Sequence, residues 1–281
     1  MNDLALLKRL QQNLGLFKKM YDSVRFVDPL KKRVLELREN EVIESALICH
    51  DCWERGQICD NCISMRAYLN DECYMKLEQD KDVMVIVTAL PVEEAGVPIV
   101  VELIKNATDK FILGPDDAGD MQSVQCVVSA FNNLIVRDEL TGLFNRRFID
   151  ERLPADVVGA TLESAPLSVV FMDLDNLKEI NDVHGHVYGD KTIQEVAAII
   201  NRGIRRQSDW AARYGGDEFF ICLNHTDAAE AYAIADRIRD GVAALRIPAG
   251  SGAVVSTTVS VGVFTAQIGR ASCRERVYHP V

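Results

Sequence analysis

An apolar run that ends in two carboxylates constrains this chain more than any other segment. Residues 167–172 (LSVVFM) have the continuous hydrophobicity of a strand buried on both faces, and Asp173 and Asp175 follow directly. Ionised carboxylates are costly to bury unless they are paired or bound to a metal. We therefore expect a central strand whose carboxyl-terminal end holds Mg²⁺, which takes one or two carboxylates and then substrate phosphate oxygens.

A second acidic turn follows later in the chain, in the segment 213–219 (RYGGDEF). Gly215 and Gly216 predict a hairpin turn and allow the backbone to approach a ligand closely. Asp217 and Glu218 come directly after them. Two acidic turns at strand ends predict one shared metal site. Such a site is typical of enzymes that transfer phosphoryl groups, in which substrate positioning and the charge of the metal ion supply most of the catalysis.

Composition narrows the class of protein. The 281 residues are 48% hydrophobic, which is enough for two globular domains, and the net charge is −11. An acidic surface repels phosphate backbones, so we expect no nucleic-acid partner. No apolar stretch approaches the roughly 18 residues that span a bilayer. The N-terminus lacks the basic segment followed by an apolar segment that is typical of a signal peptide. We expect a cytoplasmic protein.

The first half of the chain predicts a sensor between two helices. Apolar residues spaced by three and four predict an N-terminal helix over residues 1–25, packed on its own domain or paired in a coiled coil. Residues 26–115 are rich in cysteine, and two β-branched segments, 83–90 and 97–104, predict an antiparallel hairpin. This arrangement resembles a PAS domain. A heptad pattern over residues 116–136 then predicts a signalling coiled coil or a helix packed on a sheet.

Residues 137–267 have an α/β pattern. Segments 189–206 and 226–245 have helical spacing of apolar residues, and segments 218–223 and 254–264 are predicted strands.

Five ordered motifs identify this second half. They are 138–147 (DELTGLFNRR), 173–182 (DLDNLKEIND), 185–190 (GHVYGD), the RYGGDEF segment and 258–263 (TVSVGV). Together they resemble the diguanylate cyclase, or GGDEF-domain, family. The resemblance implies an α+β protein with a ferredoxin-like palm domain, and an enzyme that condenses two GTP into cyclic di-GMP and two pyrophosphates. It also implies a homodimer, because each domain brings one GTP.

The same resemblance assigns roles to individual residues. It implies that Mg²⁺ or Mn²⁺ is bound by Asp173, Asp217 and the Leu174 carbonyl. It implies a nucleotide site formed by Asn181, Asp190, His186, Gly215 and Gly216, with Lys178 neutralising triphosphate charge and Asp217 or Glu218 deprotonating the attacking 3′-hydroxyl. Each of these residues, taken singly, has a simpler interpretation. Asn181 is then a helix cap, His186 a structural histidine and Lys178 a surface lysine.

A regulatory element precedes the GGDEF turn. Arg206 and Asp209 match the family's RxxD product-inhibition site, where a guanidinium binds a phosphate or guanine edge and a carboxylate accepts from guanine. The alternative is an ion pair at a helix end.

Five of the eight cysteines lie between residues 49 and 73. Cys49, Cys52, Cys59 and Cys62 form a CxxC-x6-CxxC pattern, so they are candidate ligands for Zn²⁺ or an iron–sulfur cluster. The spacer is shorter than in common zinc modules. Thiol redox sensing and simple packing are the alternatives.

The end of the chain departs from the family. Residues 268–277 (IGRASCRERV) resemble a translated sequencing adapter, so we expect residues 268–281 to be non-native and the GGDEF domain to be incomplete. Such a chain is expected to be weakly active or inactive. Two competing functions remain at this stage: a catalytically silent receptor for cyclic di-GMP, and a metal or redox sensor that acts by interaction alone.

Overall fold

The computed structural model describes residues 20–38, 41–51, 58–80, 83–92, 98–108, 135–205, 207–249 and 253–267. The chain divides into two compact units, Met1–Ile135 and Val136–Val281. Among the helices within these ranges, none combines the length and the apolar character needed to cross a bilayer.

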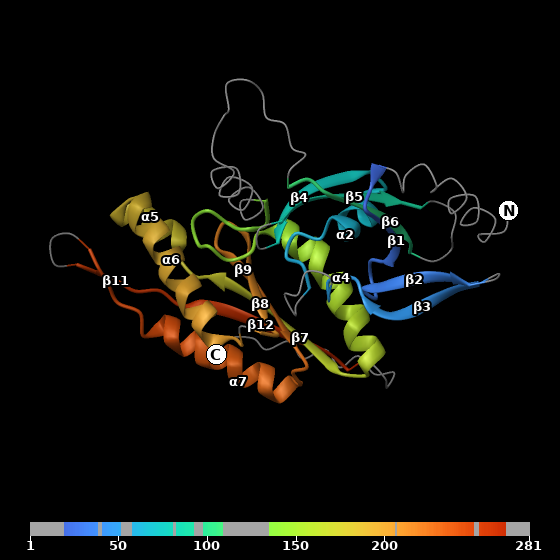
Figure 1. The fold of residues 1–281 in the computed structure, drawn as a ribbon. Helices are drawn as coiled ribbons and strands as arrows, with labels where there is room; N and C mark the ends of the chain where they lie inside the picture. Colours follow the sequence, from blue (N-terminus) through green and yellow to red (C-terminus); the bar gives the residue numbers. More distant parts are fainter. Residues whose placement is uncertain are drawn as a thin grey trace, which may run out of the picture. The chain divides into compact units, whose positions relative to one another are not determined.

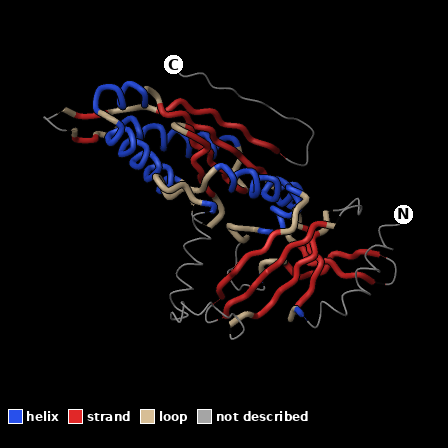
Figure 2. The backbone as a smooth tube through the Cα atoms, turned by 90° about the horizontal axis from the view of Figure 1, so that it is seen from above, coloured by secondary structure: helices blue, strands red, loops and turns tan. Residues whose placement is uncertain are grey.

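The N-terminal unit is built on one six-stranded antiparallel sheet, with strand order β3-β2-β1-β6-β5-β4 (Figures 1 and 2). Its strands are β1 Ser23–Asp28, β2 Arg33–Arg38, β3 Glu41–Ile48, β4 Tyr74–Asp80, β5 Val83–Pro91 and β6 Val100–Asn106. The predicted hairpin is confirmed, because β5 and β6 are adjacent and antiparallel. Val85, Val87 and Val100, β-branched residues of these two strands, belong to one buried core cluster of the unit.

Helix α2, Ile63–Asn70, connects the two halves of the sheet and packs on β5. Ile63 and Ala67 lie one helical turn apart and contact a core formed by Val85, Val87 and Val100. The helix ends at Asp71, which adopts a left-handed conformation with φ of 53°. This packing fixes the start of α2, and therefore Cys62 immediately before it, against the sheet.

One predicted helix is corrected by the structure. Residues 1–25 were expected to be helical, but Ser23–Asp28 forms β1, and Val24 lies opposite Leu103 of β6. The apolar side chains of β1 are better buried by a neighbouring strand than by one face of a lone helix. Residues 1–19 and 109–134, with most of both predicted helices, lie outside the described residues, and the PAS resemblance and domain boundaries stay predictions.

The C-terminal unit is built on a four-stranded antiparallel sheet with strand order β12-β7-β9-β8 (Figure 1). Its strands are β7 Pro166–Leu174, β8 Trp210–Gly215, β9 Glu218–Asn224 and β12 Val259–Gln267. Helices α5 (Leu177–His184) and α6 (His186–Gly203) connect β7 to β8, and α7 (Ala228–Ala243) connects β9 to β12. This βαββαβ order is the ferredoxin-like fold, as predicted, and β7 is an interior strand.

Helices cover both faces of this sheet. Helices α6 and α7 pack on one face, where Val170, Met172 and Ile221 are fully buried. Helix α4, Arg146–Glu163, packs on the opposite face, where the rings of Phe148 and Trp210 meet edge to face. Helices on both faces agree with the continuous hydrophobicity of residues 167–172. The expected burial on both faces is complete only on the side of α6 and α7, because Val169 is half-buried and Phe171 is 38% exposed on the other side.

The predicted strand over residues 254–264 is divided in the structure. Val254–Val255 forms β11, which pairs with β10, Ile247–Pro248, in a separate two-stranded sheet. The remainder belongs to β12, which begins at Val259. The interruption at residues 256–258 brings hydroxyl side chains to the end of β7, as described below.

Candidate functional site

The two acidic turns meet at one end of the sheet. Asp173, near the end of β7, lies opposite Glu218, the first residue of β9. The backbone N–H of Leu174 donates to the carbonyl of Asp217 over 3.0 Å, which joins the strand end to the turn. Antiparallel pairing of β7 and β9 therefore produces the convergence that the sequence predicted.

The turn between β8 and β9 is held by Arg213. Gly216 has φ of +36°, a conformation that side chains rarely adopt, and the ladder shifts register between Arg213 and Gly215. Arg213 donates to the Gly216 carbonyl from Nε at 3.0 Å and from Nη2 at 2.7 Å. Its Nη1 also lies 3.4 Å from the carboxylate of Asp138.

Asp138 belongs to the DELTG segment and orders the turn that follows it. Its Oδ1 accepts from the Thr141 N–H at 2.9 Å and from the Thr141 hydroxyl at 2.7 Å. Arg213 thus connects the first family motif to the GGDEF turn. Both residues stood within recognised motifs, but no role had been assigned to either, since the pairing spans 75 positions of sequence.

The acidic residues at this end differ in their partners. Asp175 is fully engaged: it accepts from the Thr258 hydroxyl at 2.5 Å and the Ser260 hydroxyl at 2.8 Å. Its N–H donates to the Thr258 carbonyl at 3.0 Å. Asp175 therefore fastens the end of β7 to the start of β12.

The other three carboxylates have no such support. Within the described ranges, no side chain or backbone group donates a hydrogen bond to the carboxylates of Asp173, Asp217 or Glu218. Partial burial, together with the negative charges of Asp217, Glu218 and then Asp175, raises the pKa of Asp173 above its ordinary value. Such a carboxyl binds its proton more tightly in the folded than in the unfolded chain, so stability falls as pH rises through the folded-state pKa.

A divalent cation would relieve this repulsion. Carboxylate and carbonyl oxygens are the ligands that Mg²⁺ prefers, and all the groups at this end are of that type. No group of three or more His, Cys, Asp or Glu side chains in the described part is arranged to hold a metal ion. The predicted set differs from such a group, because it has two carboxylates and the backbone carbonyl of Leu174. The donor chemistry therefore fits Mg²⁺ or Mn²⁺.

Helix α5 begins three residues after β7 ends. Asn176, before its first turn, has φ of 61°, which directs the chain sharply from the strand into the helix. The positive end of the α5 dipole therefore lies beside the acidic residues. Lys178, in the first turn, is exposed.

Asn181 is held near Asp190 by a glycine. A Cβ atom built on Gly189 would lie 2.0 Å from Asn181 Oδ1, so only glycine at this position leaves room for the amide. Asp190 is the next residue of α6, and it is exposed, as is His186 at the first position of the helix. The structure thus brings the Asn181 amide to the turn of α6 that carries Asp190. Gly189 was recognised in its motif, but its steric role was missed.

The proposed regulatory carboxylate is occupied internally. Arg205 forms a two-pronged ion pair with Asp209, from Nε to Oδ2 at 2.9 Å and from Nη2 to Oδ1 at 3.0 Å. Asp209 also accepts from the Arg205 N–H, the Ser208 hydroxyl and the Asn224 N–H. Five donors exceed the roughly four lone-pair sites of a carboxylate. Arg205 was missed as the partner, and Arg206 lies outside the described residues.

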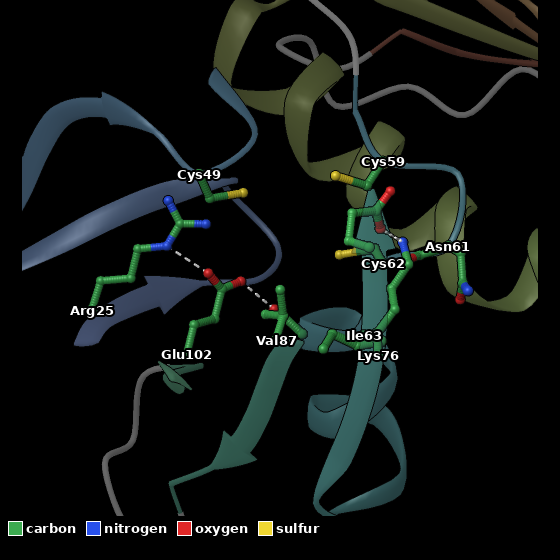
Figure 3. Close-up of a pocket in the computed structure, with 11 residues that line it drawn as sticks. Arg25, Cys49, Cys59, Asn61, Cys62, Ile63, Lys76, Val87 and Glu102 are labelled. Atoms are coloured by element: carbon green, nitrogen blue, oxygen red, sulfur yellow. Dashed lines mark hydrogen bonds and ion pairs between the residues drawn. The ribbon is translucent and has the colours of Figure 1, made fainter. Parts of the chain in front are cut away.

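Three of the four predicted cysteine ligands line one cavity of the N-terminal unit: Cys49, Cys59 and Cys62 (Figure 3). Cys52 lies outside the described residues. None of these three described cysteines is in a disulfide. The prediction of Zn²⁺ or an iron–sulfur cluster gains no support from the described residues, which contain no group arranged for a metal ion.

The fold and this geometry define the C-terminal unit as a ferredoxin-like palm domain with an acidic end. The family model for "Diguanylate cyclase, GGDEF domain" matches residues 135–277, slightly more than half of the chain. The chain therefore belongs to the GGDEF-domain diguanylate cyclase family.

Curated relatives agree with this assignment. Diguanylate cyclase DosC of Escherichia coli K12 is 38% identical over 125 residues, which cover 44% of this chain and 27% of that protein. Response regulator PleD of Caulobacter vibrioides is 39% identical over 131 residues, which cover 46% of this chain and 29% of that protein. The chain thus matches less than a third of the length of either relative.

A solved structure matches the fold. The coiled coil and GGDEF domain of DgcB from Caulobacter crescentus, in complex with c-di-GMP, has a TM-score of 0.51 and 25% sequence identity. The match covers 55% of this chain and 82% of that one. The likeness supports the palm fold.

Proposed function

We propose that the GGDEF domain of this chain condenses two GTP into cyclic di-GMP and two pyrophosphates. The observation that carries the proposal is the cluster of Asp173, Asp217 and Glu218, whose carboxylates receive no hydrogen bond from the described residues. Maintaining like charges side by side costs stability. A site for a metal ion and a triphosphate explains why the chain keeps these carboxylates together, because the bound cation would neutralise them and the substrate would complete the site.

Each nucleotide would be held by residues of one domain. Mg²⁺ or Mn²⁺, bound by Asp173, Asp217 and the Leu174 carbonyl, would supply neutralising charge for the triphosphate. Lys178, in the first turn of α5, and the N-terminus of that helix would bind phosphate oxygens. Asn181 and Asp190 would accept hydrogen bonds from the guanine edge, with His186 and the backbone at Gly215 and Gly216 completing the site. Asp217 or Glu218 would take the proton of the attacking 3′-hydroxyl.

Two domains are required for one product. Each GTP attacks the other, so two GGDEF domains must face one another, and we propose a homodimer in the cytoplasm. The N-terminal unit would regulate the alignment of the two half-sites.

The central test is turnover by the full chain. We expect GTP and Mg²⁺ to give cyclic di-GMP by nucleotide chromatography, at the low rate expected of an incomplete domain. Asp217→Ala should lower this rate at least 100-fold, because oriented charge at a reacting centre contributes about 3 kcal/mol or more. Asp150→Asn, which removes an exposed carboxylate of α4, is the matched control and should be unaffected.

Equal turnover by Asp217→Ala and the control would contradict the site assignment. A wild-type chain that makes no product but binds cyclic di-GMP would instead be the silent receptor.

The glycine beneath Asn181 provides a specificity test. Gly189→Ala should displace the Asn181 amide, because the new Cβ would clash with it at 2.0 Å. We expect KM for GTP to rise about tenfold, the loss of roughly 1.4 kcal/mol expected for one hydrogen bond to the base. We also expect a smaller rise for ITP, which lacks the exocyclic amine of guanine. Equal effects on the two nucleotides would mean that the Asn181 amide does not read the guanine edge.

Product inhibition remains a proposal that now depends on Arg206. Because five donors already occupy the carboxylate of Asp209, cyclic di-GMP would have to displace the Arg205 pair or bind Arg206 alone. We expect Arg206→Ala to raise the product concentration that halves turnover by about tenfold, the effect of losing one charge-assisted contact. Unchanged inhibition in this variant, measured in the same turnover assay, would remove the proposal.

A further inference from the structure

The thiol cavity of the N-terminal unit is a site that the cyclase reaction does not use. It is lined from five elements (β1, α2, β4, β5 and β6) and their connections. The sulfur atoms of Cys49, Cys59 and Cys62 point toward a common space in Figure 3. Its volume is about 30 Å³. A water molecule needs about 10–15 Å³ measured in the same way, so the cavity admits one or two groups of that size.

The four charged side chains that line the cavity are paired with one another. Arg25 lies 2.6 Å from Glu102, whose other oxygen accepts from the buried hydroxyl of Ser64. Lys76 forms an ion pair with Glu78. These pairs neutralise four buried or largely buried charges. The side chains of the three cysteines border the remaining space.

Lys32 lies outside the lining of the cavity but contacts one of its cysteines. It is 6% exposed, and its ammonium donates to Cys62 Sγ over 3.6 Å. Within the described residues, no carboxylate forms an ion pair with it. A buried ammonium is costly without a polar partner, and the sulfur atom of Cys62 is the side-chain atom that it contacts.

The backbone of Lys32 also contributes to the site. The Lys32 carbonyl accepts from the N–H of Cys49 at 2.9 Å. Its φ of 58° lies in the left-handed region, where a lysine is strained. One strained residue therefore contacts two of the three cysteines, Cys49 by its backbone and Cys62 by its side chain.

The three thiols are not equivalent. Cys62 is the residue before the first turn of α2, where the helix dipole favours a negative charge. Burial, followed by the neighbouring Cys62, raises the pKa of Cys59 to about 12, and burial likewise raises the pKa of Cys49. Cys59 is separated from Cys62 by only two residues, so it is the neighbouring thiol in the sequence as well as in the cavity.

We propose that this cavity is a reaction site for hydrogen peroxide, with Cys62 as the attacking sulfur and Cys59 as the thiol that resolves the product. The Cys62 thiolate attacks one peroxide oxygen, the O–O bond breaks, and Cys62 becomes a sulfenic acid while hydroxide leaves. The Cys59 thiol then attacks the sulfenic sulfur, forming the Cys59–Cys62 disulfide and releasing water. The sulfur atoms lose two electrons in total and the peroxide gains them, and Lys32 acts as a positioning residue.

The test uses the full chain, purified anaerobically and exposed to a small excess of hydrogen peroxide. Trypsin releases residues 56–66 (GQICDNCISMR), which contain Cys59 and Cys62 and no other cysteine. We expect this peptide to lose two hydrogens and to resist alkylation. Exposed Cys73 and buried Cys222 are internal controls, and both should remain reduced. Cross-linking of this peptide to the one that contains Cys49, or oxidation of Cys73 at the same rate, would overturn the proposal.

Two variants separate the roles. Cys59→Ser should stop the reaction at the sulfenic acid, so that dimedone adds to Cys62; addition elsewhere contradicts the assignment. Lys32→Met should slow disulfide formation about tenfold, whereas Lys32→Arg should retain it. Equal rates in the two Lys32 variants would show that the ammonium plays no part.

Two further outcomes decide the site itself. Cumene hydroperoxide is far larger than the cavity, so it should react at least tenfold more slowly than hydrogen peroxide, and equal rates would place the reaction outside the cavity. Stoichiometric zinc or iron in the anaerobic preparation, measured by elemental analysis, would overturn the proposal in favour of a metal site.

Discussion

Repulsion among the carboxylates at the joined ends of β7 and β9 is the constraint on which the C-terminal unit depends. Antiparallel pairing places Asp173 opposite Glu218, and the hydrogen bond from Leu174 to Asp217 brings the third carboxylate to the same place. The pKa of Asp173 rises in response. Because these carboxylates repel one another, other contacts must hold this end of the sheet together. A cation that binds there would raise the free energy of unfolding of the unit.

Those other contacts explain the remaining family motifs. Asp175 uses two hydroxyls of the β12 segment to fasten the strand end, and Arg213 connects the GGDEF turn to Asp138. Gly189 leaves room for the Asn181 amide beside Asp190. The motifs are thus of two kinds: residues that carry unpaired functional groups, and residues that hold those groups in position. The N-terminal unit follows the same logic at Lys32, where a strained backbone places an ammonium beside a thiol.

Sequence patterns predicted the palm fold because its signals are local. The continuous apolar run of β7, the paired glycines and the helical spacing in α6 and α7 each lie within one element. The helix expected at residues 23–25 was wrong, since β1 is stabilised by Leu103 and its neighbours some 80 positions away. Arg213–Asp138, Arg205–Asp209 and Gly189–Asn181 were missed for a related reason: a motif names its residues but not the contacts between them. No sequence pattern could show that hydrogen-bond donors already occupy the carboxylate of Asp209, because one of them is the backbone N–H of Asn224 in β9.

The most direct measurement is the thermal unfolding of the C-terminal unit at pH 7 with and without Mg²⁺. Fluorescence of Trp210 in a Trp53→Phe background reports this unit alone, because the chain has two tryptophans. Relief of repulsion should make Asp173→Asn melt above the unsubstituted chain in the absence of Mg²⁺, while Asp150→Asn should not. Mg²⁺ should then raise the melting temperature of the unsubstituted chain and have little effect on Asp173→Asn. Melting of Asp173→Asn below the unsubstituted chain, or equal stabilisation of both by Mg²⁺, would contradict the account.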